Sequence, residues 1–569
     1  MPTRLAPGLV RPSGTTCVGT DNGKDSGPVI PLKALTSSQY QISTAGSCGE
    51  HVSTSGLPVE RIPRRKIHCI LPSSPWLADS KTNIPLGVLY IAALLREDGH
   101  DVGVTSMLDK RYEGNIALPD AVMDADIHMF GFCTPQMGEA MELAAYIKDR
   151  NPHALTVAGG PHPSYEPKEV KAAVRQEAYH IKGPLRLRRD YSVGLDTRTL
   201  FDTVIVMEGE IAVRQMLTDW HHDQLQPYYY GDKMDVPNLD EVPFPAWDLL
   251  PDDHIFNDGI AVMKRPYKES PVRPGAFPVM SMIGTRGCPY KCTYCSTPWI
   301  GQKPRYRSPA NQIAELQAIF NAGVRMIKWQ DDTYTLHKTK LRELADAIHT
   351  EFGDSFFASR VHTRVNTLDD HVAESLKRMS CKVTCFGIES GSQRVLDANQ
   401  KNTKVAQNTQ ALKTAKAHGF YTVAFLVAGL AGETEETARE TIAWLEEVRP
   451  YLDACNLAVG IPYPGSRFWT HPMESGIDIL DYNYDNQWIV GFSARDEIIV
   501  RPHGISTDGM FKVKDQMFRA LVDLGYAKAE WDEDVRIRKQ QAAAEDAGTL
   551  KPWTYETGGA PGGISYAGH

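Results

Sequence analysis

The chain has 569 residues, a length that predicts two or three domains because a single hydrophobic core seldom serves so many residues. Its formal net charge of -9 at pH 7 argues against a general binder of nucleic acid or of anionic membrane surfaces. Ten cysteines, with no secretory signal pattern at the N-terminus, favour free thiols and metal ligands over a disulfide framework. We therefore expect a cytoplasmic enzyme with no nucleic-acid partner and no membrane partner.

The first part of the chain alternates between strand-like and helix-like segments. Residues 1–62 are rich in Ser, Thr, Gly and Pro and are expected to form a disordered extension. Helical periodicity is found at 85–99 and 137–152. The expected strands are 66–72, 101–105, 124–133, 153–160 and 202–210. This alternation predicts a Rossmann-like, doubly wound parallel sheet, which we assign to a domain at 63–235.

The long connection at 163–200 carries a basic stretch and is expected to be a surface insertion. Three prolines in DEVPFPAWDLLP predict a linker, assigned to 236–275.

A second alternating series follows and is assigned to a domain at 276–475. After a first strand near 278–285, strands are expected at 324–330, 356–361, 382–387, 422–428 and 453–459. Helices are expected at 309–321, 338–351, 369–379, 403–418 and 433–447. Six βα units indicate a full or partial TIM-type (β/α)6 barrel. Residues 476–569 are expected to form a helical C-terminal region and a disordered tail.

Three cysteines gather in TRGCPYKCTYCS, residues 285–296, at Cys288, Cys292 and Cys295. The Pro, Tyr, Lys and Thr residues between them indicate a loop. A structural zinc site would need a fourth ligand, which Cys381, Cys385 or a histidine would have to supply. An iron–sulfur cluster held by three thiolates would instead leave one iron open to an exogenous ligand. Both metals remain alternatives from the spacing alone.

The motif C-x-x-x-C-x-x-C, directly after the first strand of an expected barrel, resembles the radical SAM superfamily. Later segments resemble the strand ends of its barrel: KWQDDTYT (328–335), CFGIESGSQRVL (385–396), FLVAGLAGETEET (425–437) and IPYPGSRF (461–468). The resemblance implies that Cys288, Cys292 and Cys295 hold a 4Fe-4S cluster whose open iron binds S-adenosylmethionine.

The same resemblance implies a set of residues that bind S-adenosylmethionine. They are Tyr294, Asp331, Asp332, Arg364, Glu389, Ser390 and Gly429. The two aspartates would bind the ammonium group, the arginine would pair with the carboxylate, and Glu389 and Ser390 would hydrogen-bond the ribose or the aminocarboxylate. Gly429 would let the backbone approach adenine. Two alternatives stay open, in which Asp332 only caps a turn and Arg364 only forms a salt bridge within the barrel.

Four segments of the first domain resemble the cobalamin-binding domain that precedes many radical SAM domains. In chain order they are PLGVLYIAALLREDGHDV, FGFCTP, AGGPHPSYEP and VMEGE. The resemblance implies cobalamin contacts from Arg111, Thr134, Gly159, Gly160, Pro161, His162, Glu208, Gly209 and Glu210.

One departure from that family concerns the lower face of cobalt. Domains that supply a histidine there use Asp-x-His-x-x-Gly, whereas DKRYEG (109–114) has Arg111 at the histidine position. Because arginine stays protonated and does not ligate cobalt, we expect no protein histidine below the metal.

Together these resemblances imply a cobalamin-dependent radical SAM methyltransferase. It would move methyl from S-adenosylmethionine, via methylcobalamin, to an unactivated carbon or to phosphorus of a natural product or peptide. Its cluster would be reduced by an external donor such as flavodoxin or ferredoxin. The alternatives are a non-methylating cyclase or rearrangement enzyme, and a binding protein that senses cobalamin or redox state. Aromatic candidates for the substrate pocket are Trp299, Tyr463 and Trp488, and the alternative for each is packing in a core.

Overall fold

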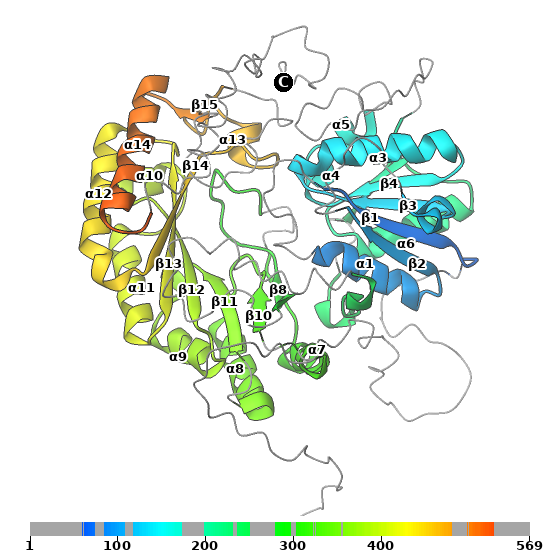
Figure 1. Ribbon diagram of the computed structural model, residues 1–569, viewed down its shortest axis with the longest axis horizontal. Helices are drawn as coiled ribbons and strands as arrows, with labels where there is room; N and C mark the ends of the chain where they lie inside the picture. The colour runs from blue at the N-terminus through cyan, green and yellow to red at the C-terminus, as the bar shows by residue number, and fades with distance from the viewer. Residues whose placement is uncertain are drawn as a thin grey trace, which may run out of the picture.

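The protein is described here from a computed structural model. It describes residues 60, 62–73, 85–107, 118–172, 199–231, 236–250, 279–297, 303–322, 324, 326–353, 357–480, 498 and 500–527. Arg111, Trp299, Trp488 and nearly all of the extension predicted at 1–62 lie outside these ranges. Two α/β units stand side by side, the first in blue to green and the second in green to orange (Figure 1). The predicted fold class is confirmed.

The first unit is a six-stranded parallel sheet with the order β2-β1-β3-β4-β5-β6. Its strands are β1 Lys66–Leu71, β2 Asp101–Ser106, β3 Ile127–Gly131, β4 Leu155–Gly159, β5 Thr203–Val206 and β6 Tyr228–Tyr230. The strand order reverses between β1 and β3, and sheets of this kind bind ligands at the carboxyl ends of the strands beside such a point. The short edge strand β6 was not predicted.

Helices cover both faces of this sheet. They are α1 Leu86–Glu97, α2 Asp120–Met123, α3 Met137–Arg150, α4 Pro161–Tyr165, α5 Pro167–Ala172 and α6 Glu210–His221. Side chains of β1 alternate between the two cores. Ile67 and Cys69 pack in the core with residues of α1 and α6, whereas Ile70 packs in the core with residues of α3. Burial on both faces explains why these strands read as continuous apolar runs.

The second unit is also a six-stranded parallel sheet, with the order β14-β13-β12-β11-β10-β7. Its strands are β7 Val279–Met282, β10 Met326–Trp329, β11 Phe357–Thr363, β12 Val383–Glu389, β13 Tyr421–Ala428 and β14 Ala454–Val459. Its helices are α7 Pro309–Asn321, α8 Lys338–Phe352, α9 Asp370–Arg378, α10 Gln393–Ala398, α11 Val405–Ala417 and α12 Glu435–Val448. Within the described residues β7 and β14 do not pair, so the barrel is a partial one.

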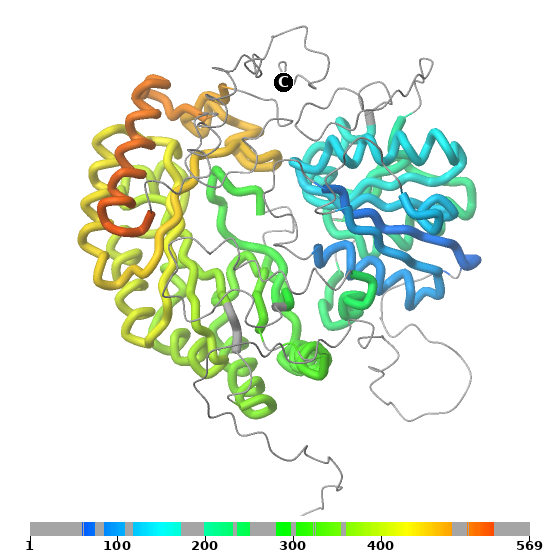
Figure 2. The backbone as a smooth tube through the Cα atoms, in the orientation of Figure 1, coloured from blue at the N-terminus to red at the C-terminus, as the bar shows by residue number. Residues whose placement is uncertain are grey.

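The two faces of this second sheet differ. Ile327, Trp329 and Val361 belong to the large core shared with the helices. Of these helices, α9, α11 and α12 lie on the side away from the first unit, whereas α7 lies near it (Figure 1). The opposite face, called the inner face below, carries a small apolar cluster of Met326, Val383, Cys385, Val423 and Ala454. Figure 2 shows the strands of this sheet as a smooth backbone tube in the same orientation.

The segment 236–250, the first part of the predicted linker, touches both units. The backbone N–H of Ala246 donates to Leu89 O at 3.1 Å, and Arg96 of α1 pairs with Asp248 at 2.9 Å. On the other side, Ser308 N donates to Asp240 Oδ1 at 2.8 Å. Its regular elements are two 3-10 turns, η7 Leu239–Glu241 and η8 Trp247–Leu249. The segment therefore helps to join the two units.

The C-terminal region contains more than the expected helix. Helix α14 spans Thr507–Asp523. The residue before it, Ser506, caps the helix because its hydroxyl accepts from Gly509 N. Before it, β15 Ile477–Ile479 pairs antiparallel with β16 Val500–Pro502, and this strand pair was not predicted. The remaining elements are η4 Thr134–Gln136, β8 Thr285–Arg286, β9 Arg305–Tyr306, η13 Val365–Thr367, η14 Arg449–Tyr451 and α13 Arg467–Thr470. Within the described residues no helix is long and apolar enough to span a bilayer.

Candidate active site

The three motif cysteines lie in one loop that follows β8 at the carboxyl end of β7. Cys292 is buried, Cys288 and Cys295 are half-buried, and all three are free thiols. Cys295 N donates to Cys292 O at 3.1 Å, so the last two cysteines share a tight turn. Burial raises the pKa of the Cys295 thiol to about 11 in the metal-free protein, and a bound metal would be needed to hold it as a thiolate.

Asp331 fixes the entry of this loop. Its carboxylate accepts from the backbone N–H of Gly284 at 3.1 Å and from the N–H and hydroxyl of Thr285 at 2.5 and 2.7 Å. Burial raises the pKa of Asp331 to about 6, although these hydrogen bonds lower it. The side chain thus ties the end of β10 to the strand before the cysteines.

Asp332, its neighbour, lies beside the cysteines themselves. Its carboxylate accepts from the N–H of Gly287 and is close enough to raise the pKa of Cys288 and Cys295. Burial and then the charge of Asp331 raise the pKa of Asp332 to about 7. Of the two predicted aspartates, Asp332 is therefore the one at the loop.

Arg364 packs directly against the cysteine loop. Its guanidinium lies 3.6 Å from the ring centroid of Tyr290, and Nη1 donates to Cys292 Sγ at 3.5 Å. Nη2 donates to the backbone carbonyl of Lys401. The guanidinium therefore lies directly beside the middle cysteine of the motif. No carboxylate pairs with Arg364 in the part of the chain that the structure describes, so the alternative of a structural salt bridge gains no support there.

Glu389 lies at the end of β12 and is held by a lysine. Its carboxylate accepts from Lys401 Nζ at 2.7 Å, and both side chains are buried. Its φ of 66° places it in the left-handed region, which a non-glycine residue rarely adopts. The next residue, Ser390, places its hydroxyl 3.0 Å from that of Thr441 in α12. Of Glu389 and Ser390, it is therefore Glu389 whose carboxylate lies at the end of β12.

Gly429 and Tyr294 complete the set predicted for S-adenosylmethionine. Gly429 has φ +87°, and a Cβ at Gly460 would lie 2.8 Å from the Gly429 carbonyl oxygen, so two backbones meet there. Tyr294 is half-buried beside Cys292, and its ring meets Phe468 edge-on at 6.4 Å. Both positions lie next to the loop or at an adjacent strand end.

The donor set fits a 4Fe-4S cluster better than one metal ion. Among the described residues, no three His, Cys, Asp or Glu side chains converge on a point where one ion would bind. A zinc ion needs such convergence. In a cluster each thiolate binds a different iron, so three free thiols spread along one loop beside Arg364 satisfy its requirement.

At the carboxyl edge of the first sheet, the backbone is packed too tightly for side chains. Gly160 has φ +103°, and a Cβ there would lie 2.8 Å from Phe132 O. Phe132 N donates to Gly159 O at 3.1 Å, and His162 N donates to Phe132 O at 3.3 Å. Gly159, Gly160 and Pro161 therefore present a flat edge of backbone, which suits the close approach of a large planar ligand.

His162 lies beneath that edge and is fully buried. Its Nδ1 is 3.2 Å from the hydroxyl of Thr134, and its ring is 6.1 Å from that of Phe132. Burial lowers the pKa of His162 to about 3, so the ring is neutral. The site therefore combines the exposed backbone of residues 159–161 with a neutral imidazole beneath it. Both features suit the macrocycle expected there.

Glu208 and Glu210, also predicted to contact cobalamin, form ion pairs with arginines of the second unit. Arg305 Nη1 donates to Glu208 Oε2 at 2.9 Å, and Arg286 Nη2 donates to Glu210 Oε1 at 2.7 Å. Although burial raises it, the pKa of Glu208 is held below its usual value by the hydrogen bond from Arg305 and the charge of Arg286. Gly209 between them packs on Ile91 of α1. Sequence reasoning missed both arginines.

Helix α4 brings the edge of the first sheet to the cysteine loop. The hydroxyl of Tyr165 donates to the backbone carbonyl of Ser296, the residue after Cys295. Its neighbour Glu166 accepts from Trp469 Nε1 at 2.6 Å. The predicted cobalamin edge and the predicted cluster loop thus meet across the boundary between the units.

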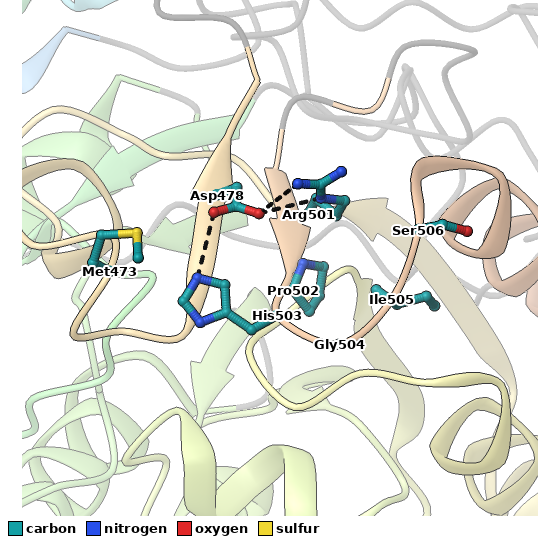
Figure 3. Close-up of a pocket in the computed structure, with 8 residues that line it drawn as sticks. All are labelled: Met473, Asp478, Arg501, Pro502, His503, Gly504, Ile505 and Ser506. Carbon is teal, nitrogen blue, oxygen red and sulfur yellow. Dashed lines mark hydrogen bonds and ion pairs between the residues drawn. The ribbon is translucent and has the colours of Figure 1, made fainter.

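A separate surface pocket of about 510 Å³ lies by the C-terminal strand pair (Figure 3). It is lined by Met473, Asp478, Arg501, Pro502, His503, Gly504, Ile505 and Ser506. Asp478 pairs with Arg501 at 2.7 Å and lies 3.4 Å from the His503 imidazole. The polar groups of this pocket thus contact one another, so we do not assign the chemistry to it.

Comparisons with known proteins decide the family. A profile of the radical SAM superfamily matches residues 282–445, and a profile of the B12 binding domain matches residues 81–185. The chain therefore combines a B12-binding domain with a radical SAM domain that follows it, the domain order of cobalamin-dependent radical SAM proteins. The family predicted from the motifs is confirmed, as are its cofactors, a 4Fe-4S cluster, S-adenosylmethionine and cobalamin. The individual residues named for each cofactor stay predictions.

Curated relatives of this radical SAM protein carry out different reactions. An uncharacterised methyltransferase of Pyrococcus horikoshii is 28% identical over 417 residues, which cover 71% of this chain and 81% of its own. A hopanoid C-3 methylase of Methylococcus capsulatus is 24% identical over 430 residues, covering 73% and 74%. An anaerobic magnesium-protoporphyrin IX monomethyl ester cyclase of Rubrivivax gelatinosus is 24% identical over 412 residues, covering 71% and 68%.

A solved structure shares the fold of this radical SAM protein. The methyltransferase TsrM of Kitasatospora setae, with cobalamin and a 4Fe-4S cluster bound, aligns with a TM-score of 0.51 at 14% identity. The alignment covers 80% of this chain and 85% of that one. The likeness extends across both units of the fold.

Proposed function

We propose that the protein is a methyltransferase that moves a methyl group from S-adenosylmethionine to an unactivated carbon, or to phosphorus, of a natural product or peptide. The observation that carries this proposal is the contact between Tyr165 and Ser296. It sets the backbone edge suited to cobalamin against the loop suited to the cluster. A methyl carrier and a radical source have to be neighbours for such a transfer. Methyltransferases among the relatives support the same reaction.

In this proposal Cys288, Cys292 and Cys295 hold the cluster. When bound, the cluster and S-adenosylmethionine supply a radical that removes hydrogen, and cobalamin carries the methyl group. Arg364 stabilises the sulfur of Cys292 and lies where a carboxylate would dock. Lys401 fixes the carboxylate of Glu389 for hydrogen bonds to the nucleoside. The buried setting of these groups excludes water and strengthens each interaction.

The proposal also includes a cobalamin domain at 63–235, a radical SAM domain at 276–475 and a small-molecule or peptide substrate. It requires an external one-electron donor such as flavodoxin or ferredoxin. We assign the protein to the cytoplasm, where a reducing environment keeps thiols free. All cysteines that the structure describes are free thiols, which supports that assignment.

A cyclase is the second candidate, since a relative of similar coverage is a cyclase. Turnover under reducing conditions separates the candidates. Formation of both deoxyadenosine and S-adenosylhomocysteine with substrate supports radical methylation. Formation of deoxyadenosine alone supports cyclisation or rearrangement. Formation of neither deoxyadenosine nor S-adenosylhomocysteine supports the sensing alternative. A Cys295→Ala variant should lose both products, whereas Cys455→Ala, at a buried site on β14 away from the loop, should keep them.

A further inference from the structure

Thr293 lies in the cysteine loop between Cys292 and Cys295, and the proposed function gives it no role. It is only 2% exposed, and its polar groups are bound by residues that are distant in the chain. Its N–H donates to Asn399 O at 3.1 Å, and its hydroxyl donates to Asn399 Oδ1 at 3.0 Å. Its carbonyl accepts from Phe468 N, in α13, at 3.0 Å. Two separate elements therefore fix the loop at this residue.

Asn399 is itself buried, at 1% exposed, and is the C-cap residue of α10. Its side-chain nitrogen donates to Val395 O at 2.7 Å and to Ala431 O at 2.9 Å. These two carbonyl acceptors leave Oδ1 as the atom that accepts from Thr293. Ala431 follows by two residues Gly429, which is predicted to lie at the adenine of S-adenosylmethionine. Asn399 thus connects the cysteine loop with the segment expected at the nucleoside.

Helix α10 ends in a turn that has an unusual backbone. Lys401 N donates to Leu396 O at 3.0 Å. Gln400 N donates to Asp397 O at 3.2 Å, which completes the pattern of a Schellman motif. The left-handed position of this motif is usually glycine, but here it is Gln400, with φ 51°. Asn402 is left-handed as well, with φ 54°. Left-handed backbone at non-glycine residues costs free energy and is concentrated at functional sites.

The same turn supports the loop a second time, through Arg364. Lys401 O accepts from Arg364 Nη2, and Nη1 of that guanidinium donates to Cys292 Sγ at 3.5 Å. The carbonyl of Lys401 therefore holds Cys292 through the arginine. The carbonyl of Asn399 holds the next residue, Thr293, directly. Groups that hold metal ligands in this way orient them and raise the affinity of the site.

We propose that Asn399 and Thr293 are positioning residues for the 4Fe-4S cluster. They hold the cysteine loop in its cluster-binding conformation and join it to the segment at Gly429. Neither residue ligates iron, and Asn399 acts through Thr293. The inference rests on the proposed function, because it takes the three loop cysteines to be the cluster ligands. Without the hydrogen bonds to Asn399 the loop would open more often, so the cluster would be lost sooner.

The rate at which the cluster is lost to an iron chelator tests this role. The full chain, loaded with its cluster without oxygen, is mixed with excess EDTA, and the decay of the 4Fe-4S absorption is followed. Thr293→Val removes the hydroxyl and nearly keeps the volume, and it should speed the loss about tenfold. Thr293→Ser keeps the hydroxyl and should lose its cluster at the rate of the unaltered protein.

Thr422→Val is the matched control for the loss of a buried hydroxyl. Thr422 is fully buried near the start of β13, and its hydroxyl donates to Tyr451 O at 2.8 Å. The start of a barrel strand lies at the end opposite to the site. Thr422→Val should therefore lower the thermal midpoint without changing the rate of cluster loss. An equal acceleration in Thr422→Val and Thr293→Val would overturn the proposal, because lower stability alone would then account for the loss.

A double variant assigns the effect to the contact itself. Asn399→Ala should speed the loss less in the Thr293→Val background than in the unaltered chain, and equal acceleration in both would overturn the proposal. No turnover is measured, so the outcome does not depend on whether the enzyme methylates or cyclises. An unchanged rate in Thr293→Val, while Cys292→Ala holds no cluster, would overturn this inference and leave the ligand assignment intact. A cluster retained in Cys292→Ala would overturn the ligand assignment and this inference with it.

Discussion

The phenolic hydroxyl of Tyr165 donates to the backbone carbonyl of Ser296, and this bond joins helix α4 of the first unit to the cysteine loop of the second. Gly465 approaches the same tyrosine so closely that a Cβ there would collide with three ring atoms. Tyr165 is therefore enclosed between Ser296 and the turn before α13. The position of the first unit relative to Cys295 depends on this ring.

The first prediction concerns Gly465→Ala. The added methyl would displace the Tyr165 ring, and the backbone at φ +85° adds a strain of about 1–2 kcal/mol. Gly525→Ala is a matched control, since Gly525 has φ +84° and open space around its Cβ position. We expect Gly465→Ala to lower the thermal midpoint more than Gly525→Ala does, as measured by calorimetry.

A double variant separates the clash of the added methyl with the Tyr165 ring from the backbone strain at position 465. Tyr165→Ala removes the ring, so Gly465→Ala should cost less in that background than in the unaltered chain. Equal costs in both backgrounds would show that the ring and the glycine do not interact.

The second prediction concerns the pair of Glu208 and Arg305. Both side chains are almost fully buried, at 4% and 13% exposed, so Arg305→Glu would place two carboxylates together. Breaking a buried ion pair of this kind lowers the free energy of unfolding by roughly 3–5 kcal/mol, and we expect a loss in that range for Arg305→Glu. The exchange of both, Glu208→Arg with Arg305→Glu, should recover part of the loss. Denaturant unfolding of the four proteins measures the coupling, and a coupling of zero would contradict the observed contact.

These two contacts also mark the limit of what the sequence could predict. All strands of the two sheets except β6 were predicted, and most of them are continuous apolar runs, such as KIHCIL in β1, that are buried on both faces. The cysteine loop was predicted because its three thiols lie within one short motif. Both signals are local in the chain.

Pairings between the units have no local signal. Arg286 lies 76 residues from Glu210, and Arg305 lies 97 residues from Glu208, so only the packed domains bring them together. Nothing near Glu208 or Glu210 in the sequence therefore indicates these ion pairs. Strand β6, with three residues, is too short to show periodicity.

The third prediction concerns Lys401, which need not touch S-adenosylmethionine. Lys401→Met leaves the carboxylate of Glu389 buried without its 2.7 Å partner, so Glu389 would turn or take up a proton. We expect the dissociation constant of S-adenosylmethionine to rise about tenfold while the cluster absorption stays unchanged. Lys404→Met serves as the control, because that side chain is 66% exposed. Unchanged affinity would remove Glu389 from the binding site.

The fourth prediction concerns the cysteines. Replacement of Cys288, Cys292 or Cys295 by alanine should abolish the 4Fe-4S absorption and lower the bound iron, because each thiolate binds a separate iron. Cys385→Ala should keep both, since Cys385 packs in the apolar cluster of the inner face. A retained 4Fe-4S spectrum in all three loop variants would refute the ligand assignment.

The fifth prediction follows from Glu433, a fully buried carboxyl group that accepts from the hydroxyl of Thr437 at 2.6 Å. Burial raises its pKa from 4.5 to about 7. Between these values the unfolded chain loses the proton that the folded chain keeps, so the free energy of unfolding falls as the pH rises and levels off above about 7. Glu433→Gln, which mimics the protonated acid, should remove this fall. Its stability relative to the unaltered protein should therefore grow by on the order of 2–3 kcal/mol between about pH 4.5 and pH 8. Glu447→Gln, exposed in the last turn of the same helix, should show no such change in denaturant unfolding. A parallel pH dependence in the Glu433→Gln variant and the unaltered protein would show that Glu433 ionises normally in the fold.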